Sequence, residues 1–252
     1  MNKRSAVVLL AAAIILVLCG TAMGSQVEMP SDKYFTLVDE KNHIIHQTAL
    51  KVFVGDIYIS ADNSRYEVVD IIGSTAKCKY QGKEKMPTIN EVNNQAAFNR
   101  AIPVVGQGKP TIAIYHTHSD ESYVPTDGKE SINGNGGIYD VGKALVQKLK
   151  AQGFNVIYNQ ANHNPHDVNA YNRSRKTAVS LLKKQPDVIL DVHRDAVPAS
   201  EYQTTVKGQD VTKVKLVVGR SNPNMKTNLE FAKMLKAAMD KKEPGLSNGI
   251  YM

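Results

Sequence analysis

Two short segments carry side chains that can bind a metal ion. Residues 115–121 read YHTHSDE and residues 191–195 read DVHRD. The long apolar approaches to them, TIAIY and DVILDV, are typical of buried central strands. In open α/β sheets, ligands bind beyond the carboxyl ends of the strands. We therefore expect the two polar segments to lie side by side at one edge of a sheet.

The first segment contains a His-x-x-Glu pattern formed by His118 and Glu121. His193, at the end of the other strand, can add a second imidazole. Two imidazoles and one carboxylate form a three-ligand zinc site with an open fourth position, which is the arrangement found in hydrolytic zinc centres. Such a cation activates water and polarises the carbonyl under attack. The pattern predicts a zinc-dependent amide hydrolase.

Two alternatives remain open at this level. Residues two apart on a strand share a side, so either His116 or His118 can be the ligand, with the other histidine supporting it. A strand-end histidine also often makes only hydrogen bonds, and His-x-x-Glu occurs frequently by chance. A cluster of satisfied polar side chains is therefore the alternative to a metal site.

Further polar residues flank these segments. Asp191 or Asp195 can fix the tautomer of His193 by accepting its second ring N–H. Arg194 can bind a substrate carboxylate or form a surface ion pair. Residues 163–167 also include metal-capable side chains, but this composition favours a solvated turn before a helix.

The elements that position these residues alternate between strand and helix from residue 110 onward. Apolar residues recur at helical spacing in 139–153, 169–185 and 228–242, and β-rich runs cover 111–118, 154–158, 187–195 and 213–219. This alternation predicts an α/β domain over 110–252, with a mixed or parallel sheet and flanking helices. Residues 34–81 predict a small β-rich module, and the polar stretch 82–109 predicts a linker.

The N-terminus is predicted to form a membrane anchor or a signal segment over residues 1–24. Residues 6–24 are apolar or small and follow Lys3 and Arg4. A run of about 20 such residues spans a bilayer as a helix, and the basic flank orients it with the N-terminus inside. A cleaved signal peptide and a buried core helix are the alternatives. We expect a single-pass protein of the cell membrane with its C-terminal domain outside the cytoplasm.

The composition narrows the class of partner. The chain of 252 residues has a formal net charge of +7, which favours an anionic partner such as wall polymer. Nucleic acid is not expected, because the basic residues are scattered and there are no Trp and only 5 Phe. With two cysteines, one of them in the N-terminal apolar run, no disulfide framework is expected.

Three ordered motifs resemble the stage II sporulation protein P family: IYHTHSDESYVP at 114–125, AYNRSRKTA at 170–178 and LDVHRDAVP at 190–198. The resemblance implies an N-acetylmuramoyl-L-alanine amidase with endopeptidase activity that acts on peptidoglycan during spore engulfment, in the intermembrane space of the sporangium. It also implies a fold similar to zinc amidases, a Zn²⁺ cofactor, and a complex with stage II sporulation protein D and a membrane scaffold protein.

Carried over by position, the resemblance places His118 and His193 as the two histidine ligands. Zinc amidases of this type have a further glutamate, the general base, after a late hydrophobic strand. No residue here matches that position, and no strand is expected after helix 228–242. We therefore expect the α/β domain to lack about 50 residues or more. The alternative function is a non-catalytic, membrane-tethered module that binds the cell wall.

Overall fold

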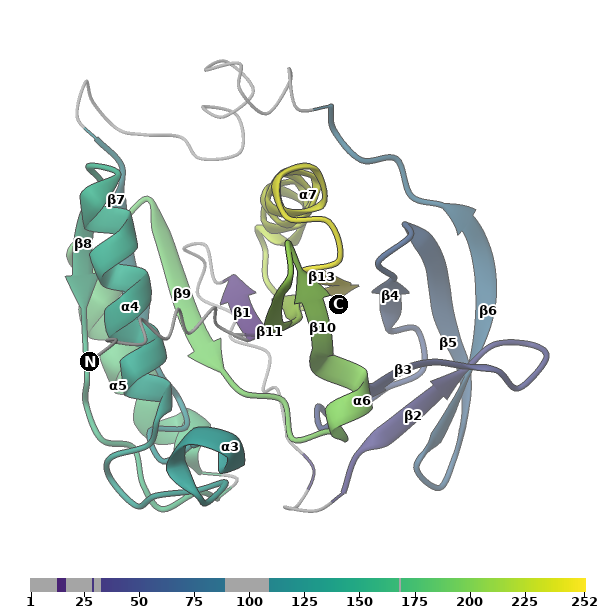
Figure 1. Ribbon diagram of the computed structural model, residues 1–252, viewed down its shortest axis with the longest axis horizontal. Helices are drawn as coiled ribbons and strands as arrows, with labels where there is room; N and C mark the ends of the chain where they lie inside the picture. Colours follow the sequence, from purple (N-terminus) through teal and green to yellow (C-terminus); the bar gives the residue numbers. More distant parts are fainter. Residues whose placement is uncertain (1–12, 17–28, 30–32, 89–108, 168) are drawn as a thin grey trace.

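The computed structural model describes residues 13–16, 29, 33–88, 109–167 and 169–252. Its main sheet has eleven strands in the order β3-β2-β6-β5-β4-β13-β12-β1-β9-β7-β8 (Figure 1). Both parallel and antiparallel pairs occur, so the predicted α/β class is confirmed with a mixed sheet. The strands are β1 (Ala13–Leu16), β2 (Phe35–Val38), β3 (Ile44–Thr48), β4 (Ile57–Ile59), β5 (Ser64–Ile72), β6 (Thr75–Lys83), β7 (Thr111–Tyr115), β8 (Asn155–Tyr158), β9 (Val188–His193), β12 (Val214–Val218) and β13 (Ser247–Tyr251).

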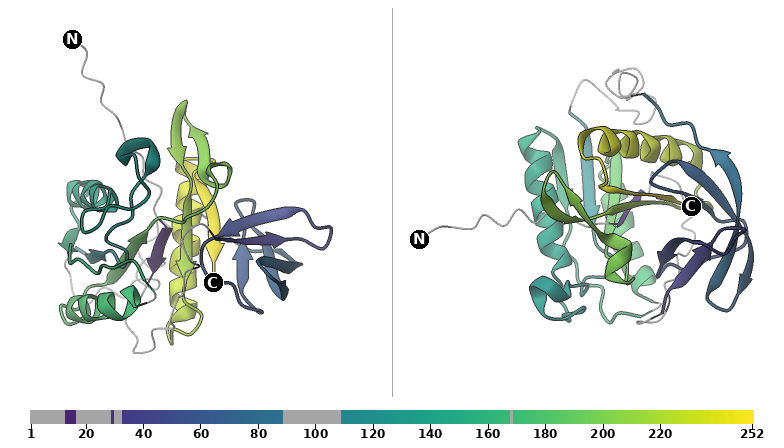
Figure 2. Two further views of the ribbon diagram at one scale, coloured as in Figure 1. Left: turned by 90° about the horizontal axis from the view of Figure 1, so that it is seen from below. Right: turned by 45° about the vertical axis from the view of Figure 1, so that its right-hand side comes forward.

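Strand β7 lies between β8 and β9 and is parallel to both. Its residues alternate between two cores, because successive side chains of a strand point to opposite faces. Ile112 and Ile114 pack in the cluster that includes helix α4 (Ile138–Ala151), whereas Ala113 and Tyr115 pack with helix α5 (Ala170–Leu182). The two helices therefore cover opposite faces of this part of the sheet (Figure 2, left).

Helix α7 (Met225–Lys242) covers the centre of the sheet and contacts β12 and β13. Two short helices, α3 (Val124–Asp127) and α6 (Ala199–Tyr202), follow β7 and β9. After α6 comes a two-stranded hairpin that sequence patterning did not predict, β10 (Gln203–Val206) with β11 (Gln209–Thr212). Lys207 and Gly208 form its turn with φ of 52° and 77°, as a tight hairpin turn with positive φ requires.

The predicted β-rich region forms strands β2 to β6, which continue the same sheet. Antiparallel pairing of β4 with β13 joins it to the α/β part, with Ile59 opposite Ile250. The two parts also share a core, since Val217 and Tyr251 pack with residues such as Leu37 and Val68. We keep the name β-rich module for residues 35–83. Residues 89–108, most of the predicted linker, lie outside the described residues.

The end of the α/β part differs from the sequence prediction. Residues Ser247–Tyr251 form strand β13 between β12 and β4, although no strand was predicted after the last helix. The hydrophobic pattern of the sequence does not indicate this strand, because the strand is short and contains Gly249, which adopts a φ of 97°. A Cβ atom at this glycine would lie 2.1 Å from the carbonyl oxygen of Ile59. Glycine is thus required where β13 approaches β4.

The predicted membrane helix is also corrected. Residues Ala13–Leu16, inside the apolar run, form strand β1, which is parallel to β12 and antiparallel to β9. The reason is that a short run rich in isoleucine also suits a strand in the middle of a sheet. Among the described residues, no helix is long and apolar enough to cross a membrane. Strand β1 thus contradicts the continuous membrane helix on which the predicted single-pass location depended, and the rest of residues 1–24 lies outside the described residues.

Candidate metal centre

The ends of β7 and β9 lie side by side, as predicted. Tyr115 is opposite Asp191 in the parallel pair, so residues 116–121 and the end of β9 leave the sheet at one edge. The rings of His118 and His193 lie with centroids 5.3 Å apart and planes at 67°. Because the planes cross at a steep angle, lone pairs that lie in these planes can converge on one point. Both side chains are buried.

Glu121 faces His193 from the first segment. Its Oε2 accepts a hydrogen bond of 2.6 Å from the backbone N–H of Arg194, and its Oε1 lies 3.8 Å from Nδ1 of His193. That gap is longer than a hydrogen bond. Two donors that each lie about 2 Å from one zinc ion are up to about 4 Å apart, so the gap fits two ligands of one cation. Glu121 and His193 are therefore close enough to share one cation.

Asp191 holds the other side of His193. Its Oδ1 lies 2.9 Å from Nε2 of that histidine, and Oδ1 also accepts a bond of 2.9 Å from the N–H of Thr117. Burial raises the pKa of Asp191, but His193 and Thr117 lower it to a net value of about 2. A carboxylate on the second ring nitrogen is the usual support of a metal-binding histidine.

The electrostatics of His193 reflect the same two carboxylates. Burial lowers the pKa of His193, but Asp191 and Glu121 outweigh that effect and raise the pKa well above its ordinary value. Without a metal, the imidazole thus tends to hold a proton between two acids. A cation at the same position would replace the charge of that proton.

His116 makes structural hydrogen bonds with both ring nitrogens. Its Nδ1 donates to the carbonyl of Val192 over 2.9 Å, and its Nε2 lies 2.9 Å from the hydroxyl of Tyr158, which also donates to the carbonyl of Tyr139. Burial lowers the pKa of His116 to about 4. Gly142 of α4 leaves room for the pair, since a Cβ atom there would lie 2.2 Å from the Tyr158 hydroxyl. Of the two candidate histidines, the geometry therefore favours His118 as the ligand.

Asp120 and His166 lie at the same edge; Asp120 was not predicted as a site residue, and His166 was assigned to a solvated turn. Nδ1 of His166 lies 3.1 Å from Oδ1 of Asp120, and donor atoms of these residues and of His118 all lie within 4.8 Å of one another. However, the His166 ring stacks on His118 at 4.2 Å with planes only 21° apart. When two imidazoles are stacked face to face, their in-plane lone pairs point past one another and converge poorly on one cation. We therefore treat His166 as packing on His118.

A signal for His166 was available in the strand order. The loop that carries this histidine follows β8, which is parallel to β7, so it leaves the sheet at the edge that carries His118. The sequence prediction of a solvated turn agrees with His166, whose side chain is 38% exposed, but not with His163. His163 of the same loop is buried and bonds the carbonyl of His116 and the hydroxyl of Thr177.

The two residues after His193 point in different directions. The Arg194 guanidinium donates a weak bond of 3.4 Å to the carbonyl of Glu130, and within the part of the chain that the structure describes it forms no ion pair. The Asp195 carboxylate does not support His193, since it accepts a bond of 2.7 Å from the N–H of Ala49 and pairs with Lys215. Of the two candidates, Asp191 is thus the partner of His193.

With this geometry described, comparison with known proteins becomes informative. The family model of stage II sporulation protein P matches residues 45–252. The chain belongs to the stage II sporulation protein P family. A member from Bacillus subtilis (strain 168), named stage II sporulation protein P, is 32% identical over 157 residues, which make up 57% of this chain and 39% of that protein. The chain thus spans well under half the length of this relative. No solved structure matches the chain.

The range matched by this family of sporulation proteins includes residues of both the β-rich module and the candidate centre. The match begins in β3 and extends through β13, so it covers most of the β-rich module together with the edge that carries His118, Glu121 and His193. The predicted likeness to zinc amidases is not confirmed by any structural neighbour.

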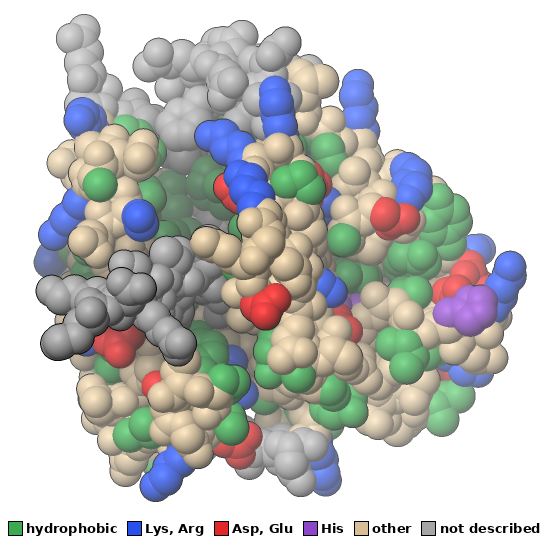
Figure 3. All heavy atoms as spheres, in the orientation of Figure 1, with side chains coloured by type: hydrophobic (Ala, Val, Ile, Leu, Met, Phe, Trp, Pro, Cys, Tyr) green, Lys and Arg blue, Asp and Glu red, His purple; other side chains and the backbone are tan. Residues whose placement is uncertain are grey.

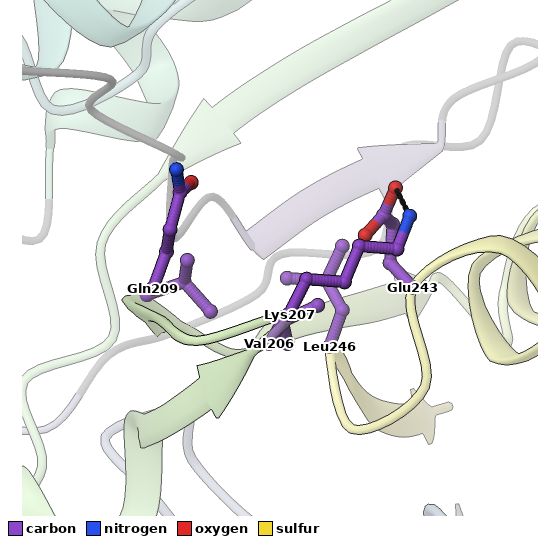
Figure 4. A pocket seen from close by; sticks show the side chains of 6 residues that line it. Val206, Lys207, Gln209, Glu243 and Leu246 are labelled. Carbon is purple, nitrogen blue, oxygen red and sulfur yellow. Dashed lines mark hydrogen bonds and ion pairs between the residues drawn. The ribbon is translucent and has the colours of Figure 1, made fainter. Parts of the chain in front are cut away.

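A surface pocket elsewhere in this family member does not contain these residues. It has a volume of about 220 Å³ and lies between the β10–β11 hairpin and the segment after α7 (Figure 4). Its polar part includes an exposed ion pair of 2.7 Å between Lys207 and Glu243. A solvated ion pair beside Val206 and Leu246 offers little chemistry. The edge formed by β7 and β9 therefore remains the candidate site.

Proposed function

We propose that this chain is a metal-dependent peptidoglycan hydrolase that cleaves the amide bond between N-acetylmuramic acid and the stem peptide, with cross-link endopeptidase activity as a second reaction. The observation that carries the proposal is the approach of Glu121 Oε1 to His193 Nδ1 at 3.8 Å, with Asp191 on the far side of the imidazole. Family membership supports a role in sporulation, in which the cell wall is the expected substrate.

We assign His118, Glu121 and His193 as the residues that hold the metal, for which Zn²⁺ suits the mixture of imidazole and carboxylate donors. Zinc at such a site supplies a Lewis acid that polarises a carbonyl and eases the ionisation of water. The chain itself orients the donors. Asp191 turns Nδ1 of His193 toward Glu121, and the N–H of Arg194 fixes the other oxygen of Glu121.

Arg194 is the proposed anchor for the substrate. Stem peptides carry carboxylates, and a guanidinium binds a carboxylate through two parallel hydrogen bonds. The guanidinium of Arg194 lies next to the candidate centre, and its weak contact with a backbone carbonyl is easily exchanged. Lysine and arginine side chains elsewhere are spread over the face seen in Figure 3, so that face has no single basic stripe. The partners implied by the family resemblance remain predictions.

Metal content and digestion of purified peptidoglycan test the proposal together. We expect the protein to bind about one zinc ion and to release stem peptides, leaving glycan strands without peptides. His118→Ala and His193→Ala are expected to lose both metal and release. His43→Ala is the control, because His43 forms a similar contact of 3.1 Å with Asp39 on the exposed β-rich module. Cosedimentation with the wall but no release, even with added zinc, would instead support a wall-binding module.

A further inference from the structure

The segment between β9 and β10 is bound to the β-rich module at both of its ends. Near its start, Asp195 accepts hydrogen bonds from the N–H of Ala49 at 2.7 Å and from the hydroxyl of Thr48 at 3.1 Å. Near its end, Glu201 lies 2.6 Å from Nδ1 of the buried His46. Strand β3 and the residue after it thus bind this segment at two positions, Asp195 and Glu201.

A lysine from a third element completes the contact at Asp195. Lys215 of β12 is buried, and its Nζ bonds both the Asp195 carboxylate and the hydroxyl of Thr48, the latter at 2.7 Å. The buried ammonium of Lys215 requires such charged and polar partners. We call Thr48, Asp195 and Lys215 the latch. It ties the module, the segment after β9 and the middle of the sheet together.

The latch is one residue away from the candidate centre. Arg194 lies between His193 and Asp195, and its N–H holds Oε2 of Glu121 at 2.6 Å. That N–H lies in the peptide plane between His193 and Arg194, so the position of Asp195 acts on it through the φ and ψ angles of Arg194. A shift of Asp195 that rotates these angles would tilt the His193–Arg194 peptide and weaken the hydrogen bond to the Glu121 oxygen.

We propose that the latch is a positioning device through which the β-rich module sets the orientation of Glu121 in the metal centre. The proposal rests on the function proposed above in taking Glu121 and His193 as metal ligands. It gives the module a role in the site without any contact with substrate. Asp195, Lys215 and Thr48 are accordingly positioning residues and not catalytic ones.

The test uses Asp195→Asn and the double variant Asp195→Asn with Lys215→Met. The double variant removes the latch without leaving an unpaired buried charge, so it should fold where Lys215→Met alone does not. Two readouts are measured: the zinc dissociation constant by chelator competition, and hydrogen exchange at the Arg194 amide. We expect zinc binding about 10- to 100-fold weaker and Arg194 exchange about tenfold faster or more.

Asp56→Asn is the matched control. Asp56 joins the module to the segment after β12 through a bond of 2.7 Å from Arg220, and no hydrogen bond connects it to Glu121 within the described part of the chain. This variant should lower the melting temperature but leave zinc affinity and Arg194 exchange unchanged. If the latch variants behave in the same way as this control, the proposal is overturned. A different result would separate the two proposals. If the parent protein binds no zinc while Arg194 exchange is faster in the latch variants than in the parent, the proposed function is rejected but the latch still positions the Arg194 amide.

Discussion

The two histidines that follow β7 differ in what their ring nitrogens contact. His116 bonds the Val192 carbonyl and the Tyr158 hydroxyl, whereas the His118 ring crosses that of His193 at a steep angle. Sequence alternation placed both on one side of a strand and could not distinguish them. The difference arises because β7 ends at Tyr115, so neither histidine follows the alternation of the strand.

His116→Ala should therefore affect stability more than metal binding. Loss of two buried hydrogen bonds should lower the free energy of unfolding by about 1–3 kcal/mol, while zinc content stays close to that of the parent. Urea unfolding and metal analysis of the same preparations give the two quantities. Loss of zinc from His116→Ala at unchanged stability would contradict the assignment of His118.

Metal binding should release a proton from His193. The carboxylates of Asp191 and Glu121 raise the pKa of this imidazole against the effect of burial, so the metal-free form still holds a proton near neutral pH. A ligand must lose that proton, so zinc affinity should rise with pH up to the raised pKa. The stabilising effect of the charged pair on the metal-free protein is present below the unfolded pKa and is lost as pH rises through the folded pKa.

Titration calorimetry in buffers of different ionisation enthalpy measures this release, which we expect to be about one proton per zinc ion at neutral pH. In Asp191→Asn the pKa of His193 should fall, and fewer protons should be released. Equal proton release in the parent and this variant would show that Asp191 does not control the charge of His193.

Among the elements, the sequence was most informative where periodic patterns are long. Helices α4, α5 and α7 and strands β7, β8, β9 and β12 all lie within a few residues of their predicted ranges. The β10–β11 hairpin and β13 were missed because each of these strands is short and its residues are mostly polar or include glycine. The packing of His166 on His118 was missed because a loop has no period from which its direction can be inferred.

Gly249→Ala tests the close approach of β13 to β4. The new Cβ atom would lie 2.1 Å from the Ile59 carbonyl oxygen, at a φ of +97°. We expect the free energy of unfolding to fall by about 2 kcal/mol or more, which corresponds to a melting temperature lower by several degrees. Gly73→Ala is the control, since Gly73 has a φ of +61° with nothing within 4 Å. A similar loss in both variants would show that backbone strain alone, without the steric clash, accounts for the effect.

At the scale of the whole molecule, the β-rich module is part of one folded unit. It pairs with β13 and shares a core with Val217 and Tyr251. Composition and spacing identified the module but could not predict this union, because pairing between distant strands leaves no local pattern.

A single cooperative unfolding transition is expected for residues 33–252. Differential scanning calorimetry should give a ratio of calorimetric to van't Hoff enthalpy of about 1. The latch and the β4–β13 pair both cross the junction, so the module should not melt first. Two resolved transitions, or a module that unfolds before the α/β part by hydrogen exchange, would contradict this expectation.

The place of β13 also bears on when the protein can reach its final form during synthesis. Tyr58 emerges from the ribosome long before Tyr251, its partner across the sheet. Until β13 is synthesised, β4 and β12 each have one edge without the strand that pairs with it in the final sheet. Pairing between strands that lie far apart along the chain is also slow. Nascent chains should therefore depend on protection of these two exposed strand edges until translation has passed residue 251.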